Sequence, residues 1–167
     1  MTFTEYLEQL SREHALIRHS DAECHFSSLA DEQATRLSTL MHFPCVGVDR
    51  GGFLIKAVPG RTLSYSEYAV MFLQHVSDSG DTRAVLTALG DMYAVACDFL
   101  ARMMRDRKSG SYPELNLLSI EGTEGYRLVW RDSGLFGWML MFVIGEPVPV
   151  SDCRQAFEPL PTENDNR

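Results

Sequence analysis

Residues 135–150, LFGWMLMFVIGEPVPV, are the most apolar stretch of the sequence, and their conformation decides the fold. Asp132 and Glu146 bracket an uncharged run of 13 residues. A helix that crosses a membrane needs about 20 apolar residues, so this run is too short to span one. Aromatic and β-branched residues dominate its second half, and Gly145 and Pro147 follow, which favours a buried strand over a helix.

A strand from Leu135 to Ile144 would be apolar on both sides, because successive side chains point to opposite faces of a sheet. The bulkier face carries Phe136, Trp138, Leu140, Phe142 and Ile144. The second face carries Leu135, Gly137, Met139, Met141 and Val143. One long helix covers only one face, so the second needs a cover from the N-terminal helices, a loop or another copy of the chain.

Methionines on this second face favour contact with another subunit, because their flexible side chains suit adaptable interfaces. A second apolar strand, residues 68–76, shows the same two-faced pattern and is predicted to be central in the sheet. We therefore predict interface residues on these two strands, namely Met71, Met139, Met141 and Val143.

The segment from Asp81 to Gly110 predicts one long helix. Apolar residues recur at helical spacing, Asp81 can cap the first turn, and Gly110 can end the last. Gly90 interrupts the pattern, which indicates that another element packs closely there. The C-terminal end gathers four cations, Arg102, Arg105, Arg107 and Lys108. They complement the helix dipole, and docking of an acidic partner is a second interpretation of the same charges.

The remaining segments predict a second helix and further strands. Thr2 and Glu5 form a capping box before an amphipathic helix that we expect to reach Ile17. Residues 18–27 are typical of a loop, and residues 29–40 show a weaker helical pattern.

Short apolar runs flank two glycine-containing segments, and each arrangement predicts a hairpin. One turn is expected at Arg50 to Gly52, and the other at Gly122 to Gly125. The polar residues 60–67 between the first hairpin and the central strand predict a loop.

This element order predicts an α+β fold, with a mainly antiparallel sheet, one long helix packed across it and an N-terminal helix. We expect one domain over residues 1–150, since a chain of 167 residues fits a single core. Residues 151–167 are polar and contain proline, which predicts a loosely attached tail.

Charge and targeting signals narrow the expected partners and compartment. The formal charge of -8 disfavours direct binding of nucleic acid, because phosphates would be repelled. The N-terminal residues lack the pattern of a signal peptide, so a cytoplasmic location is expected, with reduced cysteines and no membrane partner.

No enzymatic motif stands out, but the sequence contains one cluster of possible metal ligands or nucleophiles. The cluster consists of His19, Cys24, His25, His42 and Cys45. Such residues could hold zinc or form a cysteine–histidine nucleophile, but their spacing matches no common zinc module. We therefore predict no catalytic, cofactor-binding or metal-binding residue, and interpret these side chains as surface histidines and small apolar cysteines.

Three segments carry a resemblance to known proteins, namely YAVMFLQHV (68–76), DFLARMMRDRKSG (98–110) and FGWMLMFVIGEP (136–147). With them, the sequence resembles, from Met1 to Val150, the small structural proteins of phage-derived gene clusters, in particular tail terminators and head–tail connectors, including variants from gut anaerobes. Tail terminators have an α+β fold with a long helix across the sheet. They lack catalytic residues and assemble as rings that end tail-tube polymerisation.

This resemblance implies a non-enzymatic assembly protein that acts through oligomerisation, in the cytoplasm or in the virion. Its implied partners are further copies of the chain, in a ring or another oligomer, and phage tail or connector proteins. No cofactor is implied. The alternative is a small intracellular adaptor module that binds another protein as a monomer or a dimer.

Overall fold

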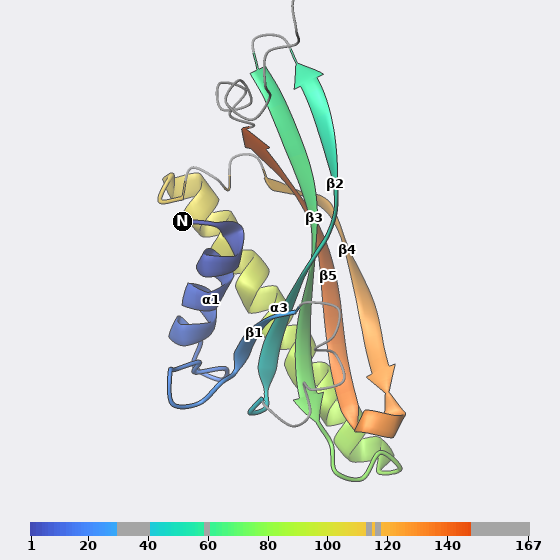
Figure 1. The fold of residues 1–167 in the computed structure, drawn as a ribbon. Helices are drawn as coiled ribbons and strands as arrows, with labels where there is room; N and C mark the ends of the chain where they lie inside the picture. Colours follow the sequence, from blue (N-terminus) through green and yellow to red (C-terminus); the bar gives the residue numbers. More distant parts are fainter. Residues whose placement is uncertain (30–40, 59–60, 113–114, 116–117, 148–167) are drawn as a thin grey trace, which may run out of the picture.

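The computed structural model describes residues 1–29, 41–58, 61–112, 115 and 118–147 of the chain (Figure 1). Its helices are α1 (Phe3–Glu13) and α3 (Thr82–Ser109). Its strands are β1 (Phe26–Leu29), β2 (Cys45–Val58), β3 (Arg61–His75), β4 (Leu118–Trp130) and β5 (Leu135–Pro147). A short 3-10 turn, η3 (Arg131–Ser133), joins β4 to β5.

The strands form one five-stranded sheet in the order β1-β2-β3-β5-β4. β1 pairs with β2 in parallel, and every other neighbouring pair is antiparallel. The helices α1 and α3 lie on the same side of this sheet, and α3 runs obliquely across it (Figure 1). The predicted α+β fold, with a long helix across a mainly antiparallel sheet, is confirmed.

Helix α1 begins at the predicted capping box. The Thr2 hydroxyl accepts from the Glu5 amide at 3.2 Å, and the Glu5 carboxylate accepts from the Thr2 amide at 2.7 Å. The helix ends at Glu13 rather than Ile17, because His14 is extended with φ of -77° and ψ of 126°. Ile17 is nevertheless fully buried, so its apolar spacing marked the core rather than a further helical turn.

Helix α3 matches its prediction at both ends. The Asp81 carboxylate accepts from the amides of Arg83 and Ala84, and Gly110 ends the helix with a φ of 70°. The expectation of close packing at Gly90 is wrong for the described residues, because a Cβ added there would meet nothing within 4 Å. Gly90 is exposed, so this position faces away from the core.

Both predicted hairpins are wrong, and so is the predicted loop at residues 60–67. β2 continues through Gly51 and Gly52, where its register with β3 shifts, and residues 61–67 belong to β3. β4 likewise continues through 122–125, with its shift between Ser119 and Glu124. Glycine permits bulges as well as turns, and only pairing with a long neighbouring strand distinguishes the two.

The N-terminal region also differs from its prediction. Residues 26–29, expected in a loop or at the start of a helix, form the edge strand β1, which pairs with residues 46–49. Such a short strand is set by its partner rather than by its own pattern. The weak helix predicted at 29–40 lies almost wholly outside the described residues.

The bulky face of β5 packs against the helices as predicted. Phe142 lies 5.9 Å from Phe3 of α1, and Phe72 of the adjacent strand lies 5.0 Å from Phe99 of α3, measured between ring centroids. The Trp138 indole donates a hydrogen bond of 2.9 Å to the carbonyl of Leu89 in α3. Aromatic rings from α1, α3, β3 and β5 therefore build the core.

The opposite face of the sheet, here called the outer face, receives neither α1 nor α3 (Figure 1). Met41 and Phe43 pack over one end of it, where Cys45, Met71 and Leu73 are buried. One expected alternative was that the N-terminal helix covers the outer face. This alternative is wrong for α1, which lies on the same side of the sheet as α3 (Figure 1). Along β4 and β5, Tyr126, Trp130 and Val143 of this face remain accessible.

Substitution of Gly137 tests how tightly the two central strands pair. A Cβ at Gly137 would overlap the backbone carbonyl oxygen of Phe72, and backbone cannot move aside easily. We expect Gly137→Ala to lower the free energy of unfolding by about 3 kcal/mol or more in urea denaturation. Gly52→Ala is the matched control, because its Cβ would meet nothing within 4 Å. Equal stability of the two variants would contradict this packing.

Candidate functional site

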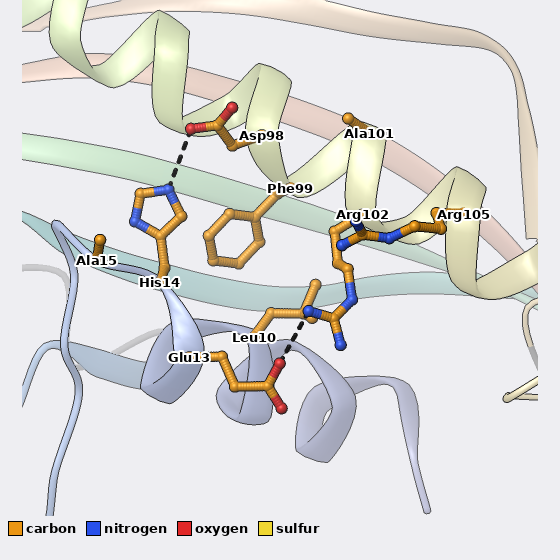
Figure 2. Close-up of a pocket in the computed structure, with 9 residues that line it drawn as sticks. All are labelled: Leu10, Glu13, His14, Ala15, Asp98, Phe99, Ala101, Arg102 and Arg105. Carbon is orange, nitrogen blue, oxygen red and sulfur yellow. Dashed lines mark hydrogen bonds and ion pairs between the residues drawn. The ribbon is translucent and has the colours of Figure 1, made fainter.

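A groove of about 420 Å³ lies between α1 and α3 (Figure 2). Leu10 and Phe99 supply apolar surface, and the charged residues lie along the two helices. The His14 ring lies 3.3 Å from the Asp98 carboxylate. Arg102 lies 2.9 Å from the Glu13 carboxylate. Both contacts join the C-terminal end of α1 to α3, so these polar groups of the groove hold the two helices together.

A buried hydrogen-bond network adds to these contacts between α1 and α3. The Tyr6 hydroxyl donates to the Asp106 carboxylate at 3.0 Å, and Arg102 Nε donates to its two oxygens at 2.8 and 3.0 Å. Asp106 is only 7% exposed, so both partners compensate for the burial of its charge. Burial, together with the hydrogen bond to Asp106, raises the pKa of Tyr6 well above its ordinary range. The sequence predicted Arg102 at an interface, and in the structure it takes part in a hydrogen-bond network within the chain.

The structure brings the predicted histidine–cysteine cluster together near the starts of β1 and β2. The His25 and His42 rings lie 5.5 Å apart, and the His42 amide donates to the Cys24 carbonyl at 2.9 Å. His25 Nδ1 lies 2.8 Å from the Pro44 carbonyl oxygen, which makes this nitrogen a donor. His19 Nδ1 accepts from the His25 amide at 3.2 Å. Both histidines therefore support the local backbone.

This cluster does not form a metal site in the described part of the chain, where no three His, Cys, Asp or Glu side chains are placed to hold an ion. Cys45 is fully buried, and that burial raises its pKa from 9.0 to about 12. A thiol that stays protonated is a poor nucleophile. Because the pKa of Cys45 is higher in the folded chain, the protonated thiol contributes to the free energy of unfolding. This contribution is complete below pH 9 and is lost as the pH rises toward 12.

The outer face of β4 and β5 carries a partly accessible apolar surface, here called the outer patch. It consists of Tyr126, Trp130, Met139, Met141 and Val143. Tyr126 is 45% exposed, Trp130 39% and Val143 38%, while Met139 and Met141 are half-buried. Tyr126 lies directly opposite Met139 in the pairing of β4 with β5, so the patch is continuous across the two strands.

Carboxylates border the outer patch. Glu67 of β3 pairs in register with Val143, and Glu124 of β4 pairs with Met141. The Tyr126 hydroxyl also hydrogen-bonds to Glu124. An apolar centre with an acidic border is a surface that suits a partner with apolar and basic groups.

The predicted interface residues fall in different environments. Met139, Met141 and Val143 belong to the outer patch, but Met71 is only 8% exposed beneath Met41 and Phe43. At the end of α3, Arg105 is exposed and Arg107 is half-buried. The sequence prediction omitted Tyr126 and Trp130, although their alternation with charged residues already placed them on one side of a strand.

No protein-family model matches the chain, and no curated protein matches it. The resemblance to tail terminators therefore stays a prediction made from the pattern of the sequence. Any function must be inferred from the geometry of the groove, the cluster and the outer patch.

Removal of the Tyr6 hydroxyl tests the joint between the helices. We expect Tyr6→Phe to lower the free energy of unfolding by about 2 kcal/mol, because the buried Asp106 loses one of its donors. Tyr112→Phe is the control, since its hydroxyl donates to the half-buried Gln9 and should cost about 0.5 kcal/mol. Chemical denaturation measures both variants, and an equal loss would contradict the assigned role of Asp106.

Thiol labelling tests the state of the cysteines. In the folded protein at pH 8, a maleimide should modify Cys24 and Cys97, which are exposed, and should spare Cys45. Peptide mapping by mass spectrometry identifies the modified positions. Labelling in denaturant should add Cys45, and rapid labelling of Cys45 without denaturant would contradict its burial.

Proposed function

We propose that this protein is a non-enzymatic assembly component that acts through oligomerisation, in the manner of the phage tail terminators that its sequence resembles. The observation that carries the proposal is the one-sided cover of the sheet. Because α1 and α3 share one face of the sheet (Figure 1), neither helix covers the outer patch, and its side chains are exposed or half-buried.

The composition of the outer patch supports a protein interface. Tyrosine, tryptophan and methionine are enriched in interfaces, and each of them occurs here. Methionine also adapts its shape to a partner. The patch lies on paired strands, which hold its side chains in a defined arrangement before a partner binds.

Charge favours a contact between unlike surfaces. Two outer patches placed face to face would bring Glu67 and Glu124 of each copy near those of the other. The C-terminal end of α3 is basic, with Arg105 and Lys108 exposed, and would attract the acidic border of a neighbouring patch. Such head-to-tail contacts form closed rings when the rotation between copies closes.

A small adaptor is the alternative, and the acidic border is the observation that favours it. A basic partner protein could occupy the outer patch in place of another copy. The two functions differ in the mass of the purified protein, because only the assembly component forms complexes of more than two copies alone.

Substitution of Val143 tests the proposal. Val143 is 38% exposed, so Val143→Glu should leave the chain folded while it places a charge in the outer patch. We expect the wild type to give complexes larger than a dimer in native mass spectrometry, and Val143→Glu to lose them. Leu16→Glu is the control, since Leu16 is 48% exposed and lies outside the patch.

Two results would count against assembly through this surface. A wild type that never exceeds a dimer at high concentration would favour the adaptor. Unchanged large complexes in Val143→Glu would place the contact elsewhere. Circular dichroism establishes that each variant is folded, and negative-stain images show whether large complexes are rings.

A further inference from the structure

A hollow of about 170 Å³ lies between the first turns of α3 and the helix side of β4. β4 is an edge strand and α3 packs mainly on β3 and β5, so only the start of α3 lies beside β4 (Figure 1). Val129 of β4 forms one apolar wall of the hollow, and Leu86 and Leu89 of α3 form the other. Leu86 is 61% exposed and Val129 is 37% exposed, so solvent reaches both walls.

Two arginines line the same hollow. Arg127 lies on the helix side of β4, because it pairs in register with Trp138, whose indole donates to α3. Arg131 follows in η3 and donates to the carbonyl oxygen of Ser79 at 3.2 Å. Within the described residues, neither guanidinium contacts a carboxylate, and no carboxylate lines the hollow. The positive charge beside this apolar surface is therefore not compensated.

The carboxylates close by in the sequence lie outside the hollow. Asp81 caps α3, where it accepts from the amides of Arg83 and Ala84. Asp132 follows Arg131 in η3 and is exposed to solvent. The whole chain carries a formal charge of -8, so a site lined by two arginines and no carboxylate differs from the general surface. Such a site attracts an anion rather than a cation.

Size and charge together define the ligand that fits. A dry cavity of about 150 Å³ holds one benzene ring, and this hollow has a similar volume. A guanidinium binds a carboxylate through two parallel hydrogen bonds, which gives both strength and a fixed direction. A ring placed between Leu86 and Val129 leaves a short carboxylate arm free to reach Arg127.

We propose that this hollow binds a small organic acid, with one carboxylate on an apolar body about the size of a ring. Arg127 binds the carboxylate, and Leu86 and Val129 pack against the apolar body. Arg131 adds positive charge while it stays bonded to Ser79. The inference does not depend on the proposed function, because the hollow and the outer patch lie on opposite faces of the sheet.

Calorimetric titration with 3-phenylpropionate tests the binding. We expect a dissociation constant of about 1 mM for the wild type, since a ligand of this size buries little surface. The neutral amide of the same acid keeps the ring and lacks the charge. It should bind at least about 10-fold more weakly, because it cannot form the charge-assisted pair with Arg127. Equal affinity for the acid and the amide would overturn the proposal.

Two variants locate the site. Arg127→Gln should raise the dissociation constant at least about 10-fold. Arg18→Gln is its matched control, because Arg18 is exposed in the loop after α1 and lines no part of the hollow. Val129→Phe should fill the hollow and abolish binding without a change of charge, and phenylalanine suits a strand. Leu54→Phe is the control for this change, since Leu54 is 55% exposed on β2. Circular dichroism establishes that each variant is folded.

Three results would overturn the proposal. The first is a wild type that shows no saturable binding in the millimolar range. The second is an unchanged dissociation constant in both Arg127→Gln and Val129→Phe. The third comes from amide NMR spectra, where the acid should shift the signals of Leu86 and Val129, and shifts confined to the groove between α1 and α3 would place the ligand there. A wild type that binds the acid but never exceeds a dimer would contradict the proposed assembly and support this inference.

Discussion

The polar contacts between α1 and α3 determine which face of the sheet the helices cover. Tyr6 and Arg102 donate hydrogen bonds to the buried carboxylate of Asp106. Glu13 contacts Arg102, and His14 contacts Asp98. Because these contacts bind the helices to each other, both pack on one face of the sheet (Figure 1). The opposite face of the sheet receives neither helix, and its apolar side chains on β4 and β5 stay exposed or half-buried.

This arrangement leaves apolar side chains accessible on the outer face. The outer patch joins aromatic and methionine side chains on β4 and β5 with an acidic border. On α3, Leu86, Tyr93 and Met104 are also more than half exposed. The groove and the histidine–cysteine cluster instead support the fold.

Several helix ends could be predicted from the sequence because the residues that form them are close together in the chain. The capping box of α1, the Asp81 cap and the Gly110 end of α3 depend on neighbours within a few residues. The hairpins at Gly51 and Gly122 were wrong because glycine marks bulges as well as turns, and long pairing with β3 and β5 decided between them. β1 and the contacts of Asp106 could not be predicted, since both depend on residues distant in sequence.

By itself, the sequence determined that LFGWMLMFVIGEP, residues 135–147, is a strand with two apolar faces and that a long helix crosses the sheet, because alternation and helical spacing are properties of consecutive residues. Only the tertiary structure decided which faces stay open. The core could in principle have placed α1 on either side of the sheet. Its hydrogen bond to Asp106 and its aromatic contacts with Tyr68 and Phe142 placed it beside α3, and left the outer patch accessible.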